Sequence, residues 1–293
     1  MKIGVIGAGL MGAEIAFVFA AAGMHVRLQD RNEEAIEAAL RRLRGILDKG
    51  VSRGIYSAEL GAAIFQRLHA TTTIEVFSDR DMVIEAVPED LGIKLNVLAE
   101  LDQLCTPECI IASNTSTFPI STLAAALAPA RRAKFLGTHF FSPVSRMDLV
   151  EVIPGFDTDP VVTQKVSSLL RQIGKLPIPV KDVAGFAVNR LLHALLIEAV
   201  RLVEEGVATP EAIDVACRAG LGHPVGPFAL MDKVSSTLCL QVQEILHEAY
   251  GERFRPAPLL KQKVAAGYGG KGDAWIGAGR QASDKNPDKS RGS

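Results

Sequence analysis

The stretch KIGVIGAGLMG, residues 2–12, decides the fold of this chain. A short run rich in Ile and Val predicts a strand over residues 2–6, and residues 14–22 have helix-forming composition. Between them lies a G-x-G-x-x-G motif, whose residues are Gly7, Ala8, Gly9, Leu10, Met11 and Gly12. In such a unit the first glycine permits a tight turn, the second admits a pyrophosphate and the third lets helix and strand pack closely. The stretch therefore predicts a dinucleotide-binding turn at a helix N-terminus.

The preferred dinucleotide depends on Asp30, which follows the next predicted strand, residues 25–29. An acid at this place holds the adenosine ribose hydroxyls and repels a 2′-phosphate, so it favours NAD over NADP. The adjacent Arg31 weakens this preference because an arginine can hold that phosphate. The alternative interpretation, a glycine-rich turn followed by a surface aspartate, stays open at this point.

Strands and helices alternate over residues 1–183. Further strands are predicted over residues 82–87, 109–112, 134–140, 149–153 and 178–180, and further helices over residues 32–48, 93–104 and 161–173. This alternation predicts an α/β fold, with a Rossmann-type, doubly wound and mostly parallel sheet covered on both faces.

Beyond residue 183 the pattern becomes helical. Periodic segments cover residues 189–205, 235–250 and 258–266, and a helix start with Thr as N-cap lies at residues 209–211. We expect an all-α domain over residues 184–282. Residues 283–293 are polar with no apolar anchor, so we expect a disordered tail.

The amino-acid composition limits the classes of partner that the protein is expected to bind. The 293 residues are 48% hydrophobic and 22% charged, with a net charge of −1. This balance is typical of a globular protein and gives no support for a nucleic-acid or membrane-surface partner. The four cysteines form no C-x-x-C pair, which favours reduced thiols and argues against a metal site. Without a leader-like start or an apolar span, we expect a cytoplasmic location.

Three segments fall where strands of the predicted sheet end: residues 86–94 (AVPEDLGIK), 113–118 (SNTSTF) and 138–144 (THFFSPV). Ligands of open α/β folds bind at the carboxyl ends of strands. His139 in the third segment and the acid Glu151 form a candidate pair for proton transfer near neutral pH. The alternatives are a packed core histidine at His139 and an edge-strand surface position for Glu151.

These motifs occur in a specific order, continued by GFAVNR (185–190) and GPFALMD (226–232). Over residues 1–271 the ordered set resembles the L-3-hydroxyacyl-CoA dehydrogenase family, including its bacterial 3-hydroxybutyryl-CoA branch. The resemblance implies NAD as cofactor, a small-molecule acyl-CoA substrate and a homodimer formed through the helical domain. The implied activity is reversible NAD-dependent oxidation of short- or medium-chain (S)-3-hydroxyacyl-CoA to 3-oxoacyl-CoA.

The resemblance also implies roles at the reacting centre. His139 would take the proton of the 3-hydroxyl group, and Glu151 would orient the imidazole and stabilise its charged form. Ser116 and Asn189 would hydrogen-bond the reacting oxygens of the substrate. The residues implied to line the cofactor site near the nicotinamide are Glu89, Lys94, Asn114, Ser116 and Lys271.

The chain departs from the family pattern in places that concern the substrate. Ser142 stands where the family often has Asn, residues 232–237 read DKVSST, and Trp275 replaces the usual aromatic of the C-terminal turn. Only Lys49 and Arg53 are available near the nucleotide end of CoA, where Arg53 would meet a phosphate. Two alternatives therefore stay open: a same-fold dehydrogenase of a CoA-free hydroxy acid or related alcohol, and a non-catalytic NAD-binding protein.

Overall fold

A computed structural model describes residues 1–272, 275 and 276. The contacts within the chain divide it into two compact units, Met1–Phe186 and a second unit that begins at Ala187. The tail predicted over residues 283–293 lies outside the described residues. Each unit has its own core, so each is described by itself.

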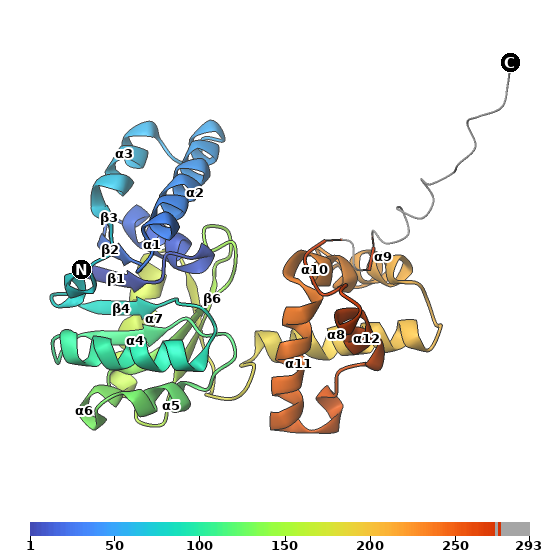
Figure 1. The fold of residues 1–293 in the computed structure, drawn as a ribbon. Coiled ribbons are helices and arrows are strands. Elements are labelled where there is room, and N and C mark those ends of the chain that lie inside the picture. The colour runs from blue at the N-terminus through green and yellow to red at the C-terminus, as the bar shows by residue number, and fades with distance from the viewer. Residues whose placement is uncertain (273–274, 277–293) are drawn as a thin grey trace, which may run out of the picture. The chain divides into compact units, whose positions relative to one another are not determined.

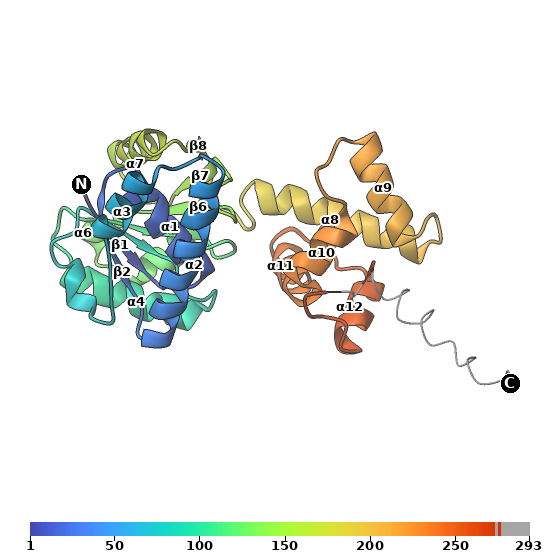
Figure 2. The same ribbon diagram turned by 90° about the horizontal axis from the view of Figure 1, so that it is seen from above.

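The first unit is built on one eight-stranded sheet (Figure 1). In their order across the sheet the strands are β3 (Leu68–Thr71), β2 (His25–Gln29), β1 (Lys2–Ile6), β4 (Met82–Glu85), β5 (Ile110–Ser113), β6 (Phe135–Phe140), β7 (Leu149–Pro154) and β8 (Leu176–Pro179). Neighbouring strands are parallel except β6 and β7, which are antiparallel. Figure 2 shows β6, β7 and β8 side by side at one edge. The mostly parallel Rossmann-type sheet predicted from the sequence is confirmed.

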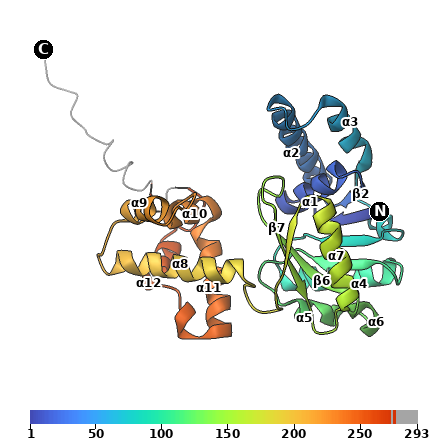
Figure 3. The same cartoon turned by 180° about the vertical axis from the view of Figure 1, so that it is seen from behind.

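Helices cover both faces of this sheet. They are α1 (Leu10–Ala21), α2 (Glu33–Ser52), α3 (Ala58–Arg67), α4 (Leu91–Leu104), α5 (Ile120–Leu123), α6 (Pro129–Arg132) and α7 (Pro160–Gln172). Helix α4 lies over one face, and α7 lies over the other face (Figures 1 and 3). Strands covered in this way are apolar on both sides, and all four residues of β4 are buried.

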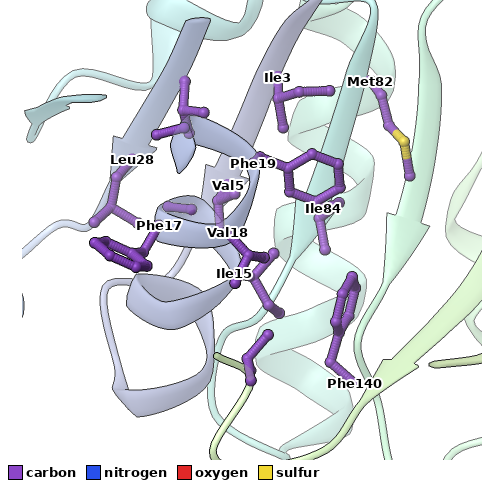
Figure 4. Packing of buried hydrophobic residues seen from close by; sticks show 14 of the residues in the cluster. Ile3, Val5, Ile15, Phe17, Val18, Phe19, Leu28, Met82, Ile84 and Phe140 are labelled. Carbon is purple, nitrogen blue, oxygen red and sulfur yellow. The ribbon is translucent and has the colours of Figure 1, made fainter. Parts of the chain in front are cut away.

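Helix α1 lies at the centre of the larger core cluster. Ile15, Phe17 and Phe19 are completely buried against residues of β1, β2 and β4. Figure 4 shows Phe19 in the same core as Phe140, the last residue of β6. Their rings meet edge to face, with centroids 6.4 Å apart. The helix that follows the glycine motif is therefore also packed against the strand that carries His139.

In the first unit the sequence prediction missed α3, β3, α5 and α6. Strand β3 reads LHAT and lies at the edge of the sheet, where only Leu68 of its four residues is buried. A four-residue edge strand carries no alternating pattern that could be recognised locally. The start of α1 was also predicted too late, because the helix begins at Leu10, inside the glycine motif.

The second unit is helical throughout its described residues. Its helices are α8 (Val188–Glu204), α9 (Pro210–Gly220), α10 (Pro227–Val234), α11 (Ser236–Tyr250) and α12 (Pro258–Ala265). Leu196, Phe228, Met231 and Leu260 form its core together with Trp275. The predicted all-α character is confirmed over this range. Among the described residues, no helix has the length and apolar composition needed to cross a membrane.

Candidate active site

The glycine motif forms a tight turn with open space at its centre. Gly7 has a φ of +100°, and a Cβ there would lie 2.6 Å from the carbonyl oxygen of Ala86. A Cβ on Gly12 would lie 1.9 Å from the oxygen of Gly7, whereas one on Gly9 would meet nothing within 4 Å. Gly9 is also the N-cap of α1 and supplies no side-chain cap. The turn therefore fits a diphosphate bound at the helix N-terminus.

A cleft of about 420 Å³ adjoins this turn, and its lining includes Gly7, Asp30, Arg31 and Pro88. The Asp30 carboxylate accepts hydrogen bonds from the backbone N–H of Ala8, at 2.8 Å, and from that of Asn32, at 3.1 Å. Asp30 is thus fixed between the glycine turn and the start of α2. This position suits the acid that binds an adenosine ribose.

His139 and Glu151 face each other on β6 and β7. The antiparallel register pairs the two residues directly, and Nδ1 of His139 lies 2.7 Å from Oε2 of Glu151. Residues opposite one another in such strands project from the same face, which brings the side chains together. Glu151 is completely buried, so the surface position considered for it is wrong. The contact engages Nδ1 and does not involve Nε2.

Aromatic rings enclose the imidazole. The ring of Phe141 lies 4.4 Å from the His139 ring between centroids, and that of Phe186 lies 5.8 Å away. His139 itself is only 6% exposed. Water is largely excluded here, so the hydrogen bond to the carboxylate is stronger than it would be in solvent.

Glu89 organises the loop that follows β5. Its Oε1 accepts hydrogen bonds from the hydroxyls of Thr115, at 2.6 Å, and Thr117, at 2.7 Å, and from the backbone N–H groups of Ser116 and Thr117. Burial alone would raise the pKa of Glu89, but the Lys94 charge and these hydroxyls outweigh it and lower the pKa. Glu89 therefore remains ionised and holds the backbone of Ser116 in place.

Lys94 contacts Glu89 and is 1% exposed. Its ammonium contacts Glu85 at 2.8 Å, Glu89 at 3.1 Å and the carbonyl of Val87 at 3.4 Å. Three acceptors match the three protons of an ammonium group. Sequence reasoning did not select Glu85 as a site residue, although an acid inside the apolar run MVIEAV was a usable signal, since buried acids are rarely unpaired.

Asn114 joins the same loop to β6. Its Oδ1 accepts a hydrogen bond from the backbone N–H of Phe140 at 2.9 Å, next to His139. The first unit thus brings the loop with Asn114 and Ser116 to the end of the strand that carries His139.

The remaining predicted residues are carried by other elements. Arg53 is the exposed C-cap of α2 in the first unit. Asn189 lies in the first turn of α8, and Lys271 is exposed after α12, both in the second unit. Within the described part of the chain, no group of three or more His, Cys, Asp or Glu residues could hold a metal ion.

Comparison with known proteins places this geometry in a family. Residues 2–183 match the NAD-binding domain of 3-hydroxyacyl-CoA dehydrogenase, and residues 185–274 match its C-terminal domain. The chain belongs to the 3-hydroxyacyl-CoA dehydrogenase family. The resemblance inferred from the motifs is confirmed, and NAD is the cofactor that the first of these domains binds.

Relatives within the 3-hydroxyacyl-CoA dehydrogenase family match almost the whole chain. A probable 3-hydroxybutyryl-CoA dehydrogenase of Deinococcus radiodurans is 41% identical over 275 residues, covering 92% of this chain and 97% of the relative. The crystal structure of (S)-3-hydroxybutyryl-CoA dehydrogenase from Ralstonia eutropha superposes with a TM-score of 0.88 at 37% identity, covering 92% of this chain and 95% of that one.

Proposed function

We propose that the protein is an NAD-dependent dehydrogenase that oxidises short- or medium-chain (S)-3-hydroxyacyl-CoA to 3-oxoacyl-CoA, reversibly. The observation that carries this proposal is the buried pair of His139 and Glu151, 2.7 Å apart, in a unit with an NAD-binding turn. Family membership and the 3-hydroxybutyryl-CoA dehydrogenases among the relatives support the substrate class.

In this proposal His139 is the general base. With Nδ1–H donated to Glu151, the lone pair of Nε2 accepts the proton of the substrate hydroxyl. The Glu151 carboxylate then stabilises the imidazolium and keeps the ring oriented. Bound NAD supplies the acceptor for the hydride that leaves the same carbon, so a C–H and an O–H bond break while the carbonyl forms. In the reverse direction the imidazolium returns its proton to the oxygen.

Neutral donors hold the reacting oxygens in this scheme. Ser116 and Asn189 are assigned this role because neither side chain takes up a proton of its own. The backbone anchoring of Ser116 by Glu89 supports its part, while the role of Asn189 rests on the resemblance. Asn114 and Glu89 shape the nicotinamide side of the site, Lys94 acts through its contact with Glu89, and Lys271 is assigned by resemblance.

In the proposal the CoA part of the substrate is bound by cations at the end of α2. Lys49 and Arg53, at the end of α2, are both exposed and are the cations assigned to its phosphates. If the substrate carried no CoA, the same His139–Glu151 chemistry would oxidise a free hydroxy acid or related alcohol. Arg53 would contact a phosphate of the substrate only if the substrate carries CoA.

NADH formation with a chain-length series of 3-hydroxyacyl-CoA esters and the matching free acids tests the proposal. We expect turnover of the esters only, and we expect Arg53→Ala to raise KM for the ester about tenfold with little change in kcat. The matched control is Arg41→Ala, since Arg41 is an exposed cation of the same helix that pairs with Glu37. Turnover of free acids without turnover of any ester would reject the CoA assignment, and an inactive protein that binds NAD would favour the non-catalytic alternative.

We further propose that the second unit forms a homodimer. Its surface carries large apolar side chains, among which Leu191 is 74%, Leu221 65% and Val207 63% exposed. Exposed apolar side chains such as these could be buried in an association surface. Sedimentation should give a dimer, and Leu191→Glu should shift the equilibrium towards the monomer.

We also propose a cytoplasmic location, which the four buried free thiols support and cell fractionation would test.

A further inference from the structure

Glu14 is a buried acid that the proposed mechanism does not use. It is the single charged residue of α1, whose sequence is LMGAEIAFVFAA, and it is 4% exposed. Its neighbours along the helix, Ala13 and Ile15, are completely buried. A carboxylate removed from water in this way is strongly destabilising unless it is hydrogen-bonded or paired. Its partners therefore indicate what it does.

The partner of Glu14 is the loop between the two catalytic strands. Its Oε2 accepts a hydrogen bond from the backbone N–H of Val144 at 2.5 Å. The ammonium of Lys175 donates to the carbonyl oxygens of Val144, at 2.5 Å, and Met147, at 2.8 Å. Both polar atoms of the Val144 backbone are thus held by side chains of opposite charge.

The Lys175 side chain is buried where it contacts this loop. Burial lowers the pKa of Lys175, while the charges of Asp148 and Glu14 act in the opposite direction. Glu14 therefore stabilises the charged form of the lysine as well as binding the loop directly. The two side chains hold Val144 from two separate places in the chain, helix α1 and the residue that precedes β8.

The clamped loop, residues 141–148, connects β6 to β7. His139 lies just before it and Glu151 just after it, so a displacement of the loop would change the alignment of both side chains. Helix α1 touches this region at a second point, where the ring of Phe19 meets that of Phe140. The N-terminal end of the same helix carries the glycine turn.

We propose that Glu14 is a positioning residue that couples the NAD-binding helix to the His139–Glu151 pair. The predicted effect of Glu14 on kcat rests on the proposed function. NAD bound at the N-terminus of α1 restrains the helix, and the bond from Glu14 to Val144 transmits that restraint to the loop. Ordering of the site by cofactor in this way would lower the entropy lost when substrate binds.

Hydrogen exchange and kinetics of Glu14→Ala and Glu14→Gln test the coupling. In the unsubstituted protein, saturating NAD should slow exchange in residues 141–148. Glu14→Ala should abolish this protection and lower kcat about tenfold, while the Kd for NAD, measured by calorimetry, changes less than about threefold. Glu14→Gln should keep most of the NAD-dependent protection and most of kcat, because its amide oxygen still accepts the hydrogen bond from the Val144 N–H.

Val18→Ala is the matched control, since Val18 is a buried residue of the same helix without a bond to the loop. It should lower stability but keep kcat and the NAD-dependent protection. Equal losses of kcat in Val18→Ala and Glu14→Ala, or full loop protection in Glu14→Ala, would overturn the proposal.

If Glu14→Ala does not fold, Glu14→Leu is used instead, because leucine fills the buried position but cannot accept the bond from Val144. Retained protection and kcat in that variant would overturn the proposal, and their loss would support it. If the unsubstituted protein turns over no hydroxyacyl-CoA, the proposed function fails, and the exchange measurement with NAD alone still decides the coupling.

Discussion

His139 and Glu151 occupy directly opposed positions on the one antiparallel strand pair of an otherwise parallel sheet, with 2.7 Å between Nδ1 and Oε2. Because both residues lie on paired strands, the strand register determines that their side chains face each other, and the loop between the strands affects their alignment. Glu14 and Lys175 hold the loop that joins the two strands through hydrogen bonds with the backbone of Val144.

Substitution of His139 or Glu151 should reduce turnover while NAD binding is retained. We expect His139→Ala to lower kcat by about a hundredfold to ten-thousandfold, since it removes the general base. Glu151→Gln keeps the shape but removes the charge that stabilises the imidazolium, so its kcat should also fall. The measurement is NADH formation, with NAD binding by calorimetry as the control. Unchanged turnover in His139→Ala would reject the mechanism.

Asp30 should determine the choice between NAD and NADP. In Asp30→Asn the amide oxygen still accepts the bond from Ala8, but the negative charge that repels a 2′-phosphate is lost. With Arg31 lining the same cleft, we expect the ratio of kcat/KM for NADP to that for NAD to rise about tenfold. Steady-state kinetics with both cofactors measure this ratio. A ratio unchanged from that of the unsubstituted protein would show that Asp30 does not discriminate.

His193 should make stability depend on pH. Burial lowers its pKa from 6.5 to about 4, and its Nδ1 has no hydrogen-bond partner. Between these values the unfolded chain binds the proton and the folded chain does not, so the free energy of unfolding falls as pH falls from 6.5 towards 4. The loss should approach about 3 kcal/mol.

Urea denaturation across that range, compared with His193→Leu, checks this expectation. The variant removes the titrating group, so its stability should decline less steeply over the same range of pH. Parallel curves for the two proteins would show that His193 is not responsible.

Ser235 should be a site where glycine is stabilising. It has a φ of +115°, a conformation that is unfavourable for residues with a Cβ. Its hydroxyl caps α11 through Leu238 N–H at 3.2 Å, and replacing a serine cap by glycine costs only a few tenths of a kcal/mol. We therefore expect Ser235→Gly to raise the free energy of unfolding by about 1 kcal/mol. Thermal melts of the two proteins measure the difference, and a lower melting temperature in the variant would contradict the strain.

Several features of the fold follow from local sequence. The glycine motif predicted the turn and the helix after it, because a Cβ at Gly7 or Gly12 would collide with neighbouring backbone, while Gly9 leaves open space at the helix N-terminus. Continuous apolar runs predicted buried parallel strands such as β1 and β4. The LHAT strand at the edge was missed, because its pairing with β2 is a tertiary contact with no local pattern behind it.

The sequence by itself determined the class of fold, the dinucleotide turn and the identity of the candidate acid–base residues. Only the tertiary structure decided that His139 and Glu151 pair, since that depends on the register of β6 with β7. It also decided that Glu85, Lys94 and Glu14 are buried with partners. Local patterns encode local backbone conformation, whereas the pairing of buried charges depends on how distant elements pack, which no short window of sequence contains.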